Sequence, residues 1–474
     1  MSGEPRTEDA RPPFGRGLPG NHWDLLDGVW PDPLPTVSVI VAHYRQQAEL
    51  DRTLAALGGQ TYPAALLEIV VVDDGSPERP RVPAGVVLVV QPDEGFRLAA
   101  ARNLGVKSST GDVLCFLDAD TAPEPDYVAR LTRLPALAPE TVAVGRRRHA
   151  TLAGIPVDAP LDLTAPAFEL PEPRWIVDAY GWYRDLLDSD DRSYRYLIGA
   201  VTACTRWFFD EVGGFDETFR EYGGEDWEWA YRAWVEGAVF AHVSDAVAWH
   251  DGPEWSGRGE TEADRRRQKN DETFRMTDVV PVGGSRGRAV RTRRPDVVVR
   301  LTGAVQAGAV QAGAVQAGAV QAGAVSLAAA FICVDTILDI LPGALVVVPD
   351  AVLGAFRWDA RVVGASSPTA TLSPPPRVVV EAAAAVRVER PGADARAVLD
   401  LATAVATVGV GTLGSVVFTS VDGDAVLTVT SHRQDARHRH WGTDDLFTTE
   451  HLTVPWLTPV DGEPGLAAYL GGWG

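Results

Sequence analysis

The sequence predicts an α/β protein with a mainly parallel sheet, followed by a second, smaller α/β domain. Over the first half of the chain, runs of β-branched residues typical of strands buried on both faces alternate with segments of helical spacing. Such alternation favours right-handed crossovers and a parallel sheet. The chain has 474 residues, and at roughly 150 residues per domain this length suggests two or three domains.

The first three strands and two helices are expected in alternation. Buried strands are predicted at 36–44, 67–76 and 111–120, with helices at 47–60 and 95–109 between them. The first helix stops at two glycines and the second is rich in alanine. Ligands of parallel sheets bind at the carboxyl ends of the strands, so this edge is the expected position of a site.

The remainder of the first domain is less regular. We expect, in order, a helix after Val128, a strand at 141–149, a proline-rich excursion at 155–174, an ordered segment at 196–252 with a helix at 225–236 and a strand ending at His250, and a charged helix at 264–278. We therefore assign an irregular segment to residues 1–35, the first domain to 36–280, a basic linker and a repeat to 281–330, and an accessory α/β domain to 331–474. The stretch "DVVVRL" ahead of the repeat also looks like a strand.

The repeat "GAVQAGAVQAGAVQAGAVQAGAV" at 303–325 is long enough to cross a bilayer. Its glutamines recur every five residues, which turns a helix by about 500° and leaves no clean apolar face. We interpret the repeat as a low-complexity expansion and expect no integral membrane span.

Charge and cysteine content exclude several functions. A net charge of −21 argues against nucleic acid or an anionic membrane as partner, because a polyanionic surface repels both. Three scattered cysteines are too few for a disulfide framework or a zinc site. The N-terminal stretch has no apolar core, so we expect no secretory signal and a cytoplasmic protein.

Two acidic pairs follow neighbouring buried strands. Asp118 and Asp120 share one face of a strand end, where their oxygens could hold a hard divalent cation and leave positions for phosphate. The alternative for this pair is a solvated turn. Asp73 and Asp74 end the preceding strand, at the edge where a carboxylate can bind a base or ribose.

The helix region between these strands carries Arg97 and Arg102. Cationic side chains there could meet a diphosphate, and a solvated helix face is an equally good interpretation.

Further downstream, "YGGEDWEW" places Glu225 and Asp226 at a helix start after two glycines. Carboxylates there complement the helix dipole, or one of them acts as a general base beside the aromatic wall of Trp227 and Trp229. His250, at the end of an apolar strand, is a candidate metal ligand, although a histidine alone is more often structural.

Taken together, residues 36–275 resemble the family 2 inverting glycosyltransferases of the GT-A fold, in particular the N-acetylgalactosaminyltransferase-like domains of bacterial chondroitin and hyaluronan polymerases. The motifs that carry the resemblance, in order, are "SVIVAHYRQ", "EIVVVDDGS", "GFRLAAARNLGVKSSTGDVLCFLDADTAPEPDYV" and "GGFDETFREYGGEDWEWAYRAWVEGAVFAHVSDAVAWHD".

The resemblance implies a role for each motif. Asp73 would contact the uracil or ribose of a UDP-sugar, with Asp74 beside it. Asp118 would lie near the ribose and the metal, and Asp120 and His250 would ligate Mn²⁺ or Mg²⁺. The following helix would supply the remaining groups: Asp226 to deprotonate the acceptor hydroxyl, Glu225 to hold sugar or acceptor hydroxyls, and Trp227 to contact the nucleotide-sugar. The acceptor would be a glycan or a small-molecule hydroxyl, attacked in a single inverting displacement.

The second half departs from the polymerases, because 296–474 has no second Asp-x-Asp at a strand edge and no Gly-Gly-Glu-Asp. Asp422 and Asp424 flank a glycine between two strands, which predicts a hairpin turn. The histidines at 432, 438 and 440 predict a solvated basic loop. We expect one transferase domain with an accessory domain. A non-catalytic protein that binds a nucleotide-sugar or a carbohydrate at a retained site is the main alternative, and a nucleotidyltransferase is a weaker one.

Overall fold

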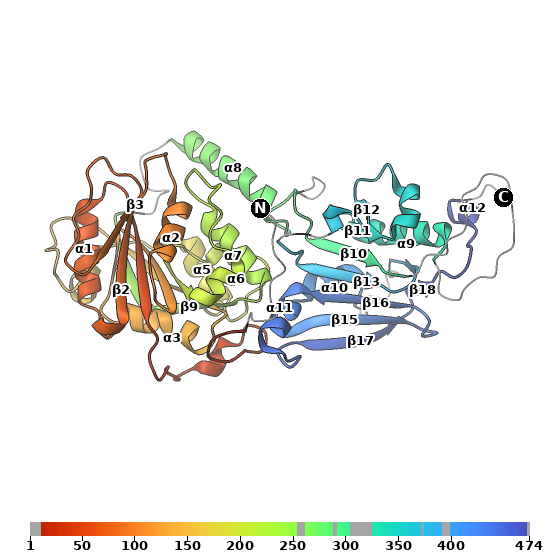
Figure 1. Cartoon of the computed structure of the whole chain (residues 1–474), viewed down its shortest axis with the longest axis horizontal. Coiled ribbons are helices and arrows are strands. Elements are labelled where there is room, and N and C mark those ends of the chain that lie inside the picture. Colours follow the sequence, from red (N-terminus) through yellow and green to blue (C-terminus); the bar gives the residue numbers. More distant parts are fainter. Residues whose placement is uncertain are drawn as a thin grey trace. The chain divides into compact units, whose positions relative to one another are not determined.

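The computed structural model describes residues 11–253, 261–287, 292–303, 325–370, 372, 374–390 and 399–471. By its internal contacts the chain divides into two compact units (Figure 1). The first contains Met1–Val280 and Ala436–Leu446, and the second contains Pro281–Asp435 and Phe447–Gly474. Residues 436–446 therefore belong to the first unit, although we expected them in the accessory domain.

A nine-stranded sheet forms the centre of the first unit, in the order β3-β2-β1-β4-β8-β6-β9-β5, with β7 paired to β6. Its strands are β1 (Val37–His43), β2 (Leu67–Asp73), β3 (Val87–Val90), β4 (Val113–Asp118), β5 (Thr121–Pro123), β6 (Thr141–Ala150), β7 (Glu169–Leu170), β8 (Val201–Thr205) and β9 (Val239–Asp251). The four neighbouring strands β3, β2, β1 and β4 are parallel to one another. β8 is antiparallel to both of its neighbours, β4 and β6, and β6 and β9 are parallel. Every residue of β1 is buried, as its β-branched run predicts.

The helices of this unit are α1 (Gln47–Gly58), α2 (Leu98–Lys107), α3 (Tyr127–Leu137), α4 (Leu161–Thr164), α5 (Arg174–Trp182), α6 (Arg206–Val212), α7 (Glu225–Val235) and α8 (Glu262–Val279). A mainly parallel sheet with helices between its strands confirms the predicted α/β fold class (Figure 1). The proline-rich excursion expected at 155–174 contains α4, and α5 begins at its last residue. The sequence analysis also missed the edge strand β3.

The segment 436–446 is fixed to the first unit by a buried charge cluster. Arg437 is fully buried and its guanidinium lies 3.1 Å from Oε2 of Glu140, while it donates to the backbone oxygens of Leu18, Gly20 and Gly237. His440 Nδ1 lies 2.7 Å from the other oxygen of Glu140. The prediction of a solvated basic loop at 432–440 is therefore wrong. These residues form a helix, α11 (His432–Trp441), and the side chains of Arg433, Arg437 and His440 on it are buried.

A seven-stranded sheet forms the centre of the second unit, in the order β12-β11-β10-β13-β16-β15-β17, beside a pair of strands β14-β18. Its elements are β10 (Val297–Leu301), α9 (Leu327–Ile340), β11 (Leu345–Val348), β12 (Val362–Gly364), β13 (Val378–Ala382), β14 (Val386–Val388), α10 (Leu401–Thr407), β15 (Leu413–Ser420), β16 (Val426–Ser431), β17 (Thr448–Val454), β18 (Leu457–Pro459) and α12 (Leu466–Tyr469). β10 lies within the interval that we assigned to the linker and repeat. The β15–β16 connection is the hairpin expected at Asp422–Asp424, with Gly423 at φ +82°.

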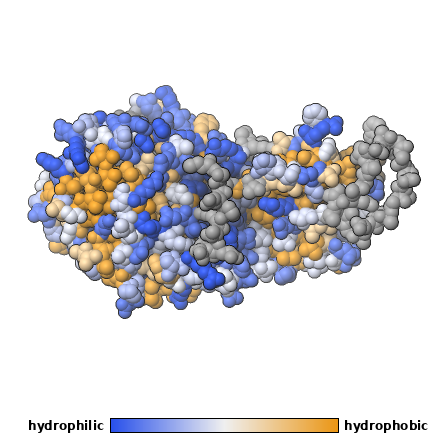
Figure 2. Space-filling model, viewed as in Figure 1, coloured by the Kyte–Doolittle hydropathy of each residue, from blue (hydrophilic) through white to orange (hydrophobic). Residues whose placement is uncertain are grey.

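No helix in the described part of the chain is long and apolar enough to cross a membrane. Residues 304–324, which make up all but the two ends of the repeat, lie outside the described residues. Hydrophilic residues cover much of the face seen in Figure 2, with smaller hydrophobic patches between them.

Candidate functional site

The two predicted acidic pairs lie at one edge of the first sheet. β1 is flanked by β2 and β4, and in the observed register His43 pairs with Asp73 while Ala42 pairs with Asp118. The carboxyl ends of these parallel strands therefore meet, as expected for a ligand site of an α/β sheet.

Asp73 is fully buried and bound to protein groups. Its carboxylate lies 2.8 Å from Nδ1 of His43 and accepts hydrogen bonds from the backbone N–H and the hydroxyl of Ser76. These contacts fix the loop after β2, so in this structure the carboxylate is enclosed rather than presented to a ligand. The family resemblance had implied a direct contact between Asp73 and the nucleotide.

A cavity of about 350 Å³ opens at this edge. Its acidic lining residues are Asp74, Asp118 and Asp120, and its aromatic ones are Tyr44, Phe96 and Tyr222. Asp74 accepts hydrogen bonds from the side chain of Gln91 and the backbone N–H of Arg97. Burial raises the pKa of Asp74, and the hydrogen bond from Gln91 opposes that shift.

Asp120 and His250 are brought together by the pairing of β5 with β9, in which Thr121 faces His250. Oδ2 of Asp120 lies 3.5 Å from Nε2 of His250 and accepts a 3.1 Å hydrogen bond from Gln46. Burial would raise the pKa of Asp120, but the hydrogen bond and charge of His250, with Gln46 and Arg147, outweigh it and lower the pKa to about 2. The carboxylate is thus ionised at neutral pH.

His250 is oriented for a ligand by its backbone contact. Its Nδ1 lies 3.1 Å from the carbonyl oxygen of Gly252, an acceptor, so Nδ1 donates to that oxygen and Nε2 faces Asp120. A separation of 3.5 Å is too long for a strong hydrogen bond. A carboxylate and an imidazole nitrogen in this arrangement fit a divalent cation as shared ligands. Among the described residues, no group of three or more His, Cys, Asp or Glu side chains forms a complete metal site.

Arg102 joins the strand edge to α7. This buried guanidinium lies 3.1 Å from Oδ1 of Asp118 and 3.0 Å from Oε1 of Glu225. It is therefore occupied by carboxylates rather than directed at a diphosphate. The other predicted cation, Arg97, forms an ion pair with Glu94 at 3.0 Å and does not line the cavity.

Glu225 and Asp226 begin α7, after Gly224 at φ +99°, a conformation that favours glycine. Oδ2 of Asp226 accepts a hydrogen bond from the backbone N–H of Gly199 at 3.0 Å. Burial raises the pKa of both carboxyl groups, the charge of Asp226 raises that of Glu225 further, and Arg102 opposes these shifts. Oε2 of Glu225 is buried without a hydrogen-bond partner among the described residues.

Trp227 lies on the same turn of α7 with its ring partly exposed. The ammonium group of Lys269 from α8 lies 4.9 Å from the centre of this ring. Trp227 does not line the 350 Å³ cavity.

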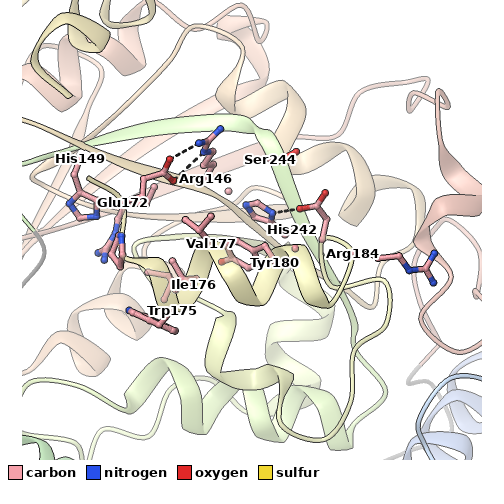
Figure 3. A pocket seen from close by; sticks show the side chains of 16 residues that line it. Arg146, His149, Glu172, Trp175, Ile176, Val177, Tyr180, Arg184, His242 and Ser244 are labelled. Carbon is pink, nitrogen blue, oxygen red and sulfur yellow. Dashed lines mark hydrogen bonds and ion pairs between the residues drawn. The ribbon is translucent and has the colours of Figure 1, made fainter. Parts of the chain in front are cut away.

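A second cavity, of about 300 Å³, lies beside β6, β9 and α5 (Figure 3). His242 borders it, with Nδ1 2.6 Å from Oδ1 of Asp185 and its ring stacked on Tyr180 at 3.6 Å. Nε2 of His242 is buried and has no hydrogen-bond partner in the part of the chain described. On the other side, Arg146 is paired with Glu172.

Two lining residues connect this second cavity to the predicted site. Ile198 precedes Gly199, which holds Asp226, and the ring of His149 lies 4.9 Å from that of His250. The half-exposed Trp175 lines the cavity from α5. It is thus a mixed aromatic and polar pocket close to the candidate base and metal ligands.

Several residues of the site were not predicted from the sequence. Gln46 lies within the quoted motif "SVIVAHYRQ", and Tyr222 directly precedes the glycine pair, so their motif positions could have identified them. Phe96 and His242 also lie within quoted motifs. Their motif positions alone do not show that each lines a cavity, because that depends on tertiary packing.

Comparison with known proteins identifies two matching domains. Residues 38–156 match the model of glycosyl transferase family 2, and residues 189–247 match the model described as the N-terminal domain of galactosyltransferase. Together these models take in the strand-edge aspartates, the Gly-Gly-Glu-Asp turn and most of β9. They confirm the resemblance predicted from the sequence motifs.

Two curated relatives illustrate the range of similar proteins. The chain is 30% identical over 260 residues to a chondroitin synthase of Pasteurella multocida, which covers 49% of this chain and 26% of the relative. It is 30% identical over 230 residues to a validoxylamine A glucosyltransferase of Streptomyces hygroscopicus subsp. limoneus. That match covers 43% of this chain and 49% of the relative. The matched region thus spans from about a quarter to about half the length of these relatives.

Solved structures with similarity to the chain include a mannosyltransferase from Pyrobaculum calidifontis in complex with GDP-Man and Mn²⁺. It is 22% identical, with a TM-score of 0.40, and the match covers 56% of this chain and 70% of that one. Another is GalNAc-T7 with UDP, GalNAc and Mn²⁺, at 21% identity and a TM-score of 0.36. The match covers 49% of this chain and 46% of that one.

Proposed function

We propose that the first unit, whose residues 38–156 match glycosyl transferase family 2, transfers a sugar from a UDP-sugar to an acceptor hydroxyl with inversion and with the help of Mn²⁺ or Mg²⁺. The acceptor is a glycan or a small hydroxyl compound. The observation that carries the proposal is the chain of contacts from Asp118 through Arg102 to Glu225, which joins the strand edge to the start of α7.

The donor occupies the 350 Å³ cavity at the strand edge. Tyr44, Phe96 and Tyr222 provide aromatic surfaces for the base, and Phe96 and Tyr222 already pack edge to face at 6.1 Å. Asp74, a lining residue, accepts from ribose or base N–H and O–H groups in the role first expected of Asp73. Asp73 instead holds the loop in place through Ser76.

Asp120 and His250 would hold the cation at the diphosphate end of this cavity. When bound, the ion supplies Lewis-acid neutralisation of the departing UDP. Gln46 keeps the Asp120 carboxylate in position by donating to Oδ2, the oxygen that faces His250.

Asp226 is the general base. The N–H of Gly199 fixes Oδ2, and the raised pKa brings the carboxyl closer to the range in which it can accept a proton from a hydroxyl. The acceptor oxygen then attacks the anomeric carbon from the face opposite to UDP, so the bond to the phosphate oxygen breaks as the new glycosidic bond forms. One base suffices for such a displacement.

Arg102 is a positioning residue in this scheme. By binding both Asp118 and Glu225 it sets the distance between the donor edge and α7, and it limits the charge repulsion among three buried or partly buried carboxyl groups. We assign it no contact with the diphosphate.

The acceptor occupies the second cavity, shown in Figure 3. Trp175 offers a face on which a sugar ring can pack, and Nε2 of His242 offers a buried polar atom for a hydroxyl. Ile198 places this cavity next to the backbone that anchors Asp226, so a ligand there would present a hydroxyl on the side of the base.

A panel of UDP-sugars, tested with Mn²⁺ and with EDTA, examines the proposal. We expect one UDP-sugar to raise the melting temperature of the full chain only with metal and to be turned over to UDP. Binding without turnover for every sugar and acceptor would favour the non-catalytic alternative. Absence of any metal-dependent binding would overturn the proposal.

A further inference from the structure

The second unit has the same strand order and strand directions as the first. In the first sheet the order is β3-β2-β1-β4-β8-β6-β9, and in the second it is β12-β11-β10-β13-β16-β15-β17. When the strands are matched in chain order, every pairing agrees: three parallel pairs, then two antiparallel pairs, then a parallel pair. Even the small antiparallel pair of β5 with the end of β9 has its counterpart in β14 with β18.

The helices and caps follow the same plan. α1 packs against β5, and its counterpart α9 packs against β14. Along the chain, α10 comes between β14 and β15, just as α3 comes between β5 and β6. Thr205, the last residue of β8, caps α6 by accepting from the N–H of Phe208 at 3.2 Å. Ser431, the last residue of β16, accepts from the N–H of Gln434 at the start of α11 at 3.3 Å. The shared order therefore extends beyond the sheet.

Strand register makes the correspondence specific to single residues. Val37 of β1 pairs with Val113 of β4, and Val297 of β10 pairs with Val378 of β13. Counting forward from Val113 reaches Asp118, Asp120 and the start of β5 at Thr121. The same count from Val378 reaches Ala383, Ala385 and the start of β14 at Val386.

The metal-ligand positions of the first unit are thus filled by residues that cannot coordinate. Ala385 stands where Asp120 stands in the first unit. Thr121 pairs with His250, and its counterpart Val386 pairs with Pro459. Alanine and proline side chains offer no oxygen or nitrogen donor, so a divalent cation does not fit this edge of the second unit.

The segments that carry the proposed base and the proposed acceptor cavity in the first unit have much shorter counterparts in the second sheet. Residues 206–238 connect β8 to β9 and include α7 with Asp226, whereas the shorter segment 432–447, of which 436–446 belong to the first unit, connects β16 to β17. The first unit has residues 151–200 between β6 and β8, including α5, whereas the second unit has the hairpin 421–425. One carboxylate persists: by register Asp350 corresponds to Asp73, the aspartate that holds a loop rather than a ligand.

We propose that the second unit is a second glycosyltransferase-type sheet whose described residues include neither a metal site nor a base, so that the part of the chain that the structure describes has a single nucleotide-sugar site. The unit keeps the framework of the transferase fold and serves binding or structure instead of transfer. This inference rests on the proposed function of the first unit, in which Asp120 and His250 hold the metal and Asp226 is the base.

Binding stoichiometry in the full chain tests the inference without using activity. Isothermal titration with Mn²⁺ and UDP should give one complex per chain, and Asp120→Ala should reduce it to none while the circular dichroism spectrum stays unchanged. His250→Ala provides a second variant if the first fails to fold. Asp350→Asn, in the corresponding position of the second unit, should leave the stoichiometry at one and the Kd within about two-fold.

The outcomes separate the two proposals. Two complexes per chain, or one complex that survives in folded Asp120→Ala and His250→Ala, would overturn the inference and leave the function of the first unit standing. Loss of binding in Asp350→Asn would also overturn it. No Mn²⁺ and UDP binding by the unaltered chain would overturn the proposed function and this inference with it.

Discussion

Nε2 of His250 lies 3.5 Å from Oδ2 of Asp120, although the two residues are far apart in the sequence. β5 and β9 are antiparallel neighbours, so the residue after Asp120 pairs directly with His250. The Asp-x-Asp motif and the distant histidine are therefore joined by sheet register. This relationship supports the proposed metal clamp of Asp120 and His250 over a solvated turn, and each of the two residues can be tested separately.

Replacing either clamp residue should weaken metal binding. We expect Asp120→Ala and His250→Ala to lower the affinity for Mn²⁺ in the presence of UDP by at least about 10-fold, because each removes a donor atom. Isothermal titration measures this. Asp126→Ala, at a half-exposed aspartate whose side-chain partners include Arg130 and Thr61, is the matched control and should change the affinity less than about two-fold.

The acceptor cavity should respond separately from the donor cavity. Trp175→Ala should raise the acceptor KM by about 10-fold, since loss of an aromatic contact costs on the order of 1 kcal/mol, and should leave UDP binding unchanged. Trp182→Ala is the control: it lies on the same helix, is 77% exposed and does not line the cavity. Equal effects of the two variants, or an effect of Trp175→Ala on UDP binding, would contradict the assignment.

Transfer should fall toward acid at a higher pH than an ordinary aspartate would impose. Burial raises the pKa of Asp226, so its carboxylate gains a proton as the pH falls through that raised pKa, and the base is lost. The acid limb of kcat/KM should therefore lie above about pH 4, the usual range of aspartate. Mn²⁺ affinity over the same pH series separates this limb from protonation of metal ligands; a limb that follows metal affinity throughout would refute the prediction.

The buried charge cluster around Glu140 should contribute strongly to stability. Arg437→Leu leaves Glu140 buried beside His440 without its guanidinium partner and frees three backbone oxygens, so we expect a loss of about 3–5 kcal/mol in the free energy of unfolding. Denaturant unfolding measures it. Arg439→Leu, two residues on and half exposed beside Glu236, should cost less than about 1 kcal/mol; similar losses in both would contradict the cluster's role.

The sequence predicted the first fold well because its signals were local. The β-branched runs of β1, β2 and β4 predict buried strands, and carboxylates placed at strand ends predict a site edge. What it missed depends on contacts between distant segments. Arg102 was expected to meet a diphosphate or to lie on a solvated helix face, whereas it is buried beside Glu225 of α7. Asp73 was expected to contact the nucleotide, whereas His43 and Ser76 enclose it.

The second unit was predicted as α/β without its relation to the first. Sequence comparison of the two halves is uninformative where alanines stand for aspartates, as at Ala383 and Ala385. The correspondence appears only when strand pairing fixes the register. The burial of Arg437 could not be predicted either, because nothing in a run of arginines and histidines indicates that one of them is fully buried.

The central claim, inverting transfer with Asp226 as base, is tested most directly by NMR of UDP-sugar turnover in the full chain with Mn²⁺. An α-linked UDP-sugar should first give the β-anomer. Asp226→Asn should slow turnover by about 10²- to 10⁴-fold while UDP-sugar affinity stays within about three-fold, and the exposed Glu221→Gln should behave as the unaltered chain. An α-anomer as first product, or undiminished turnover in Asp226→Asn, would contradict the account.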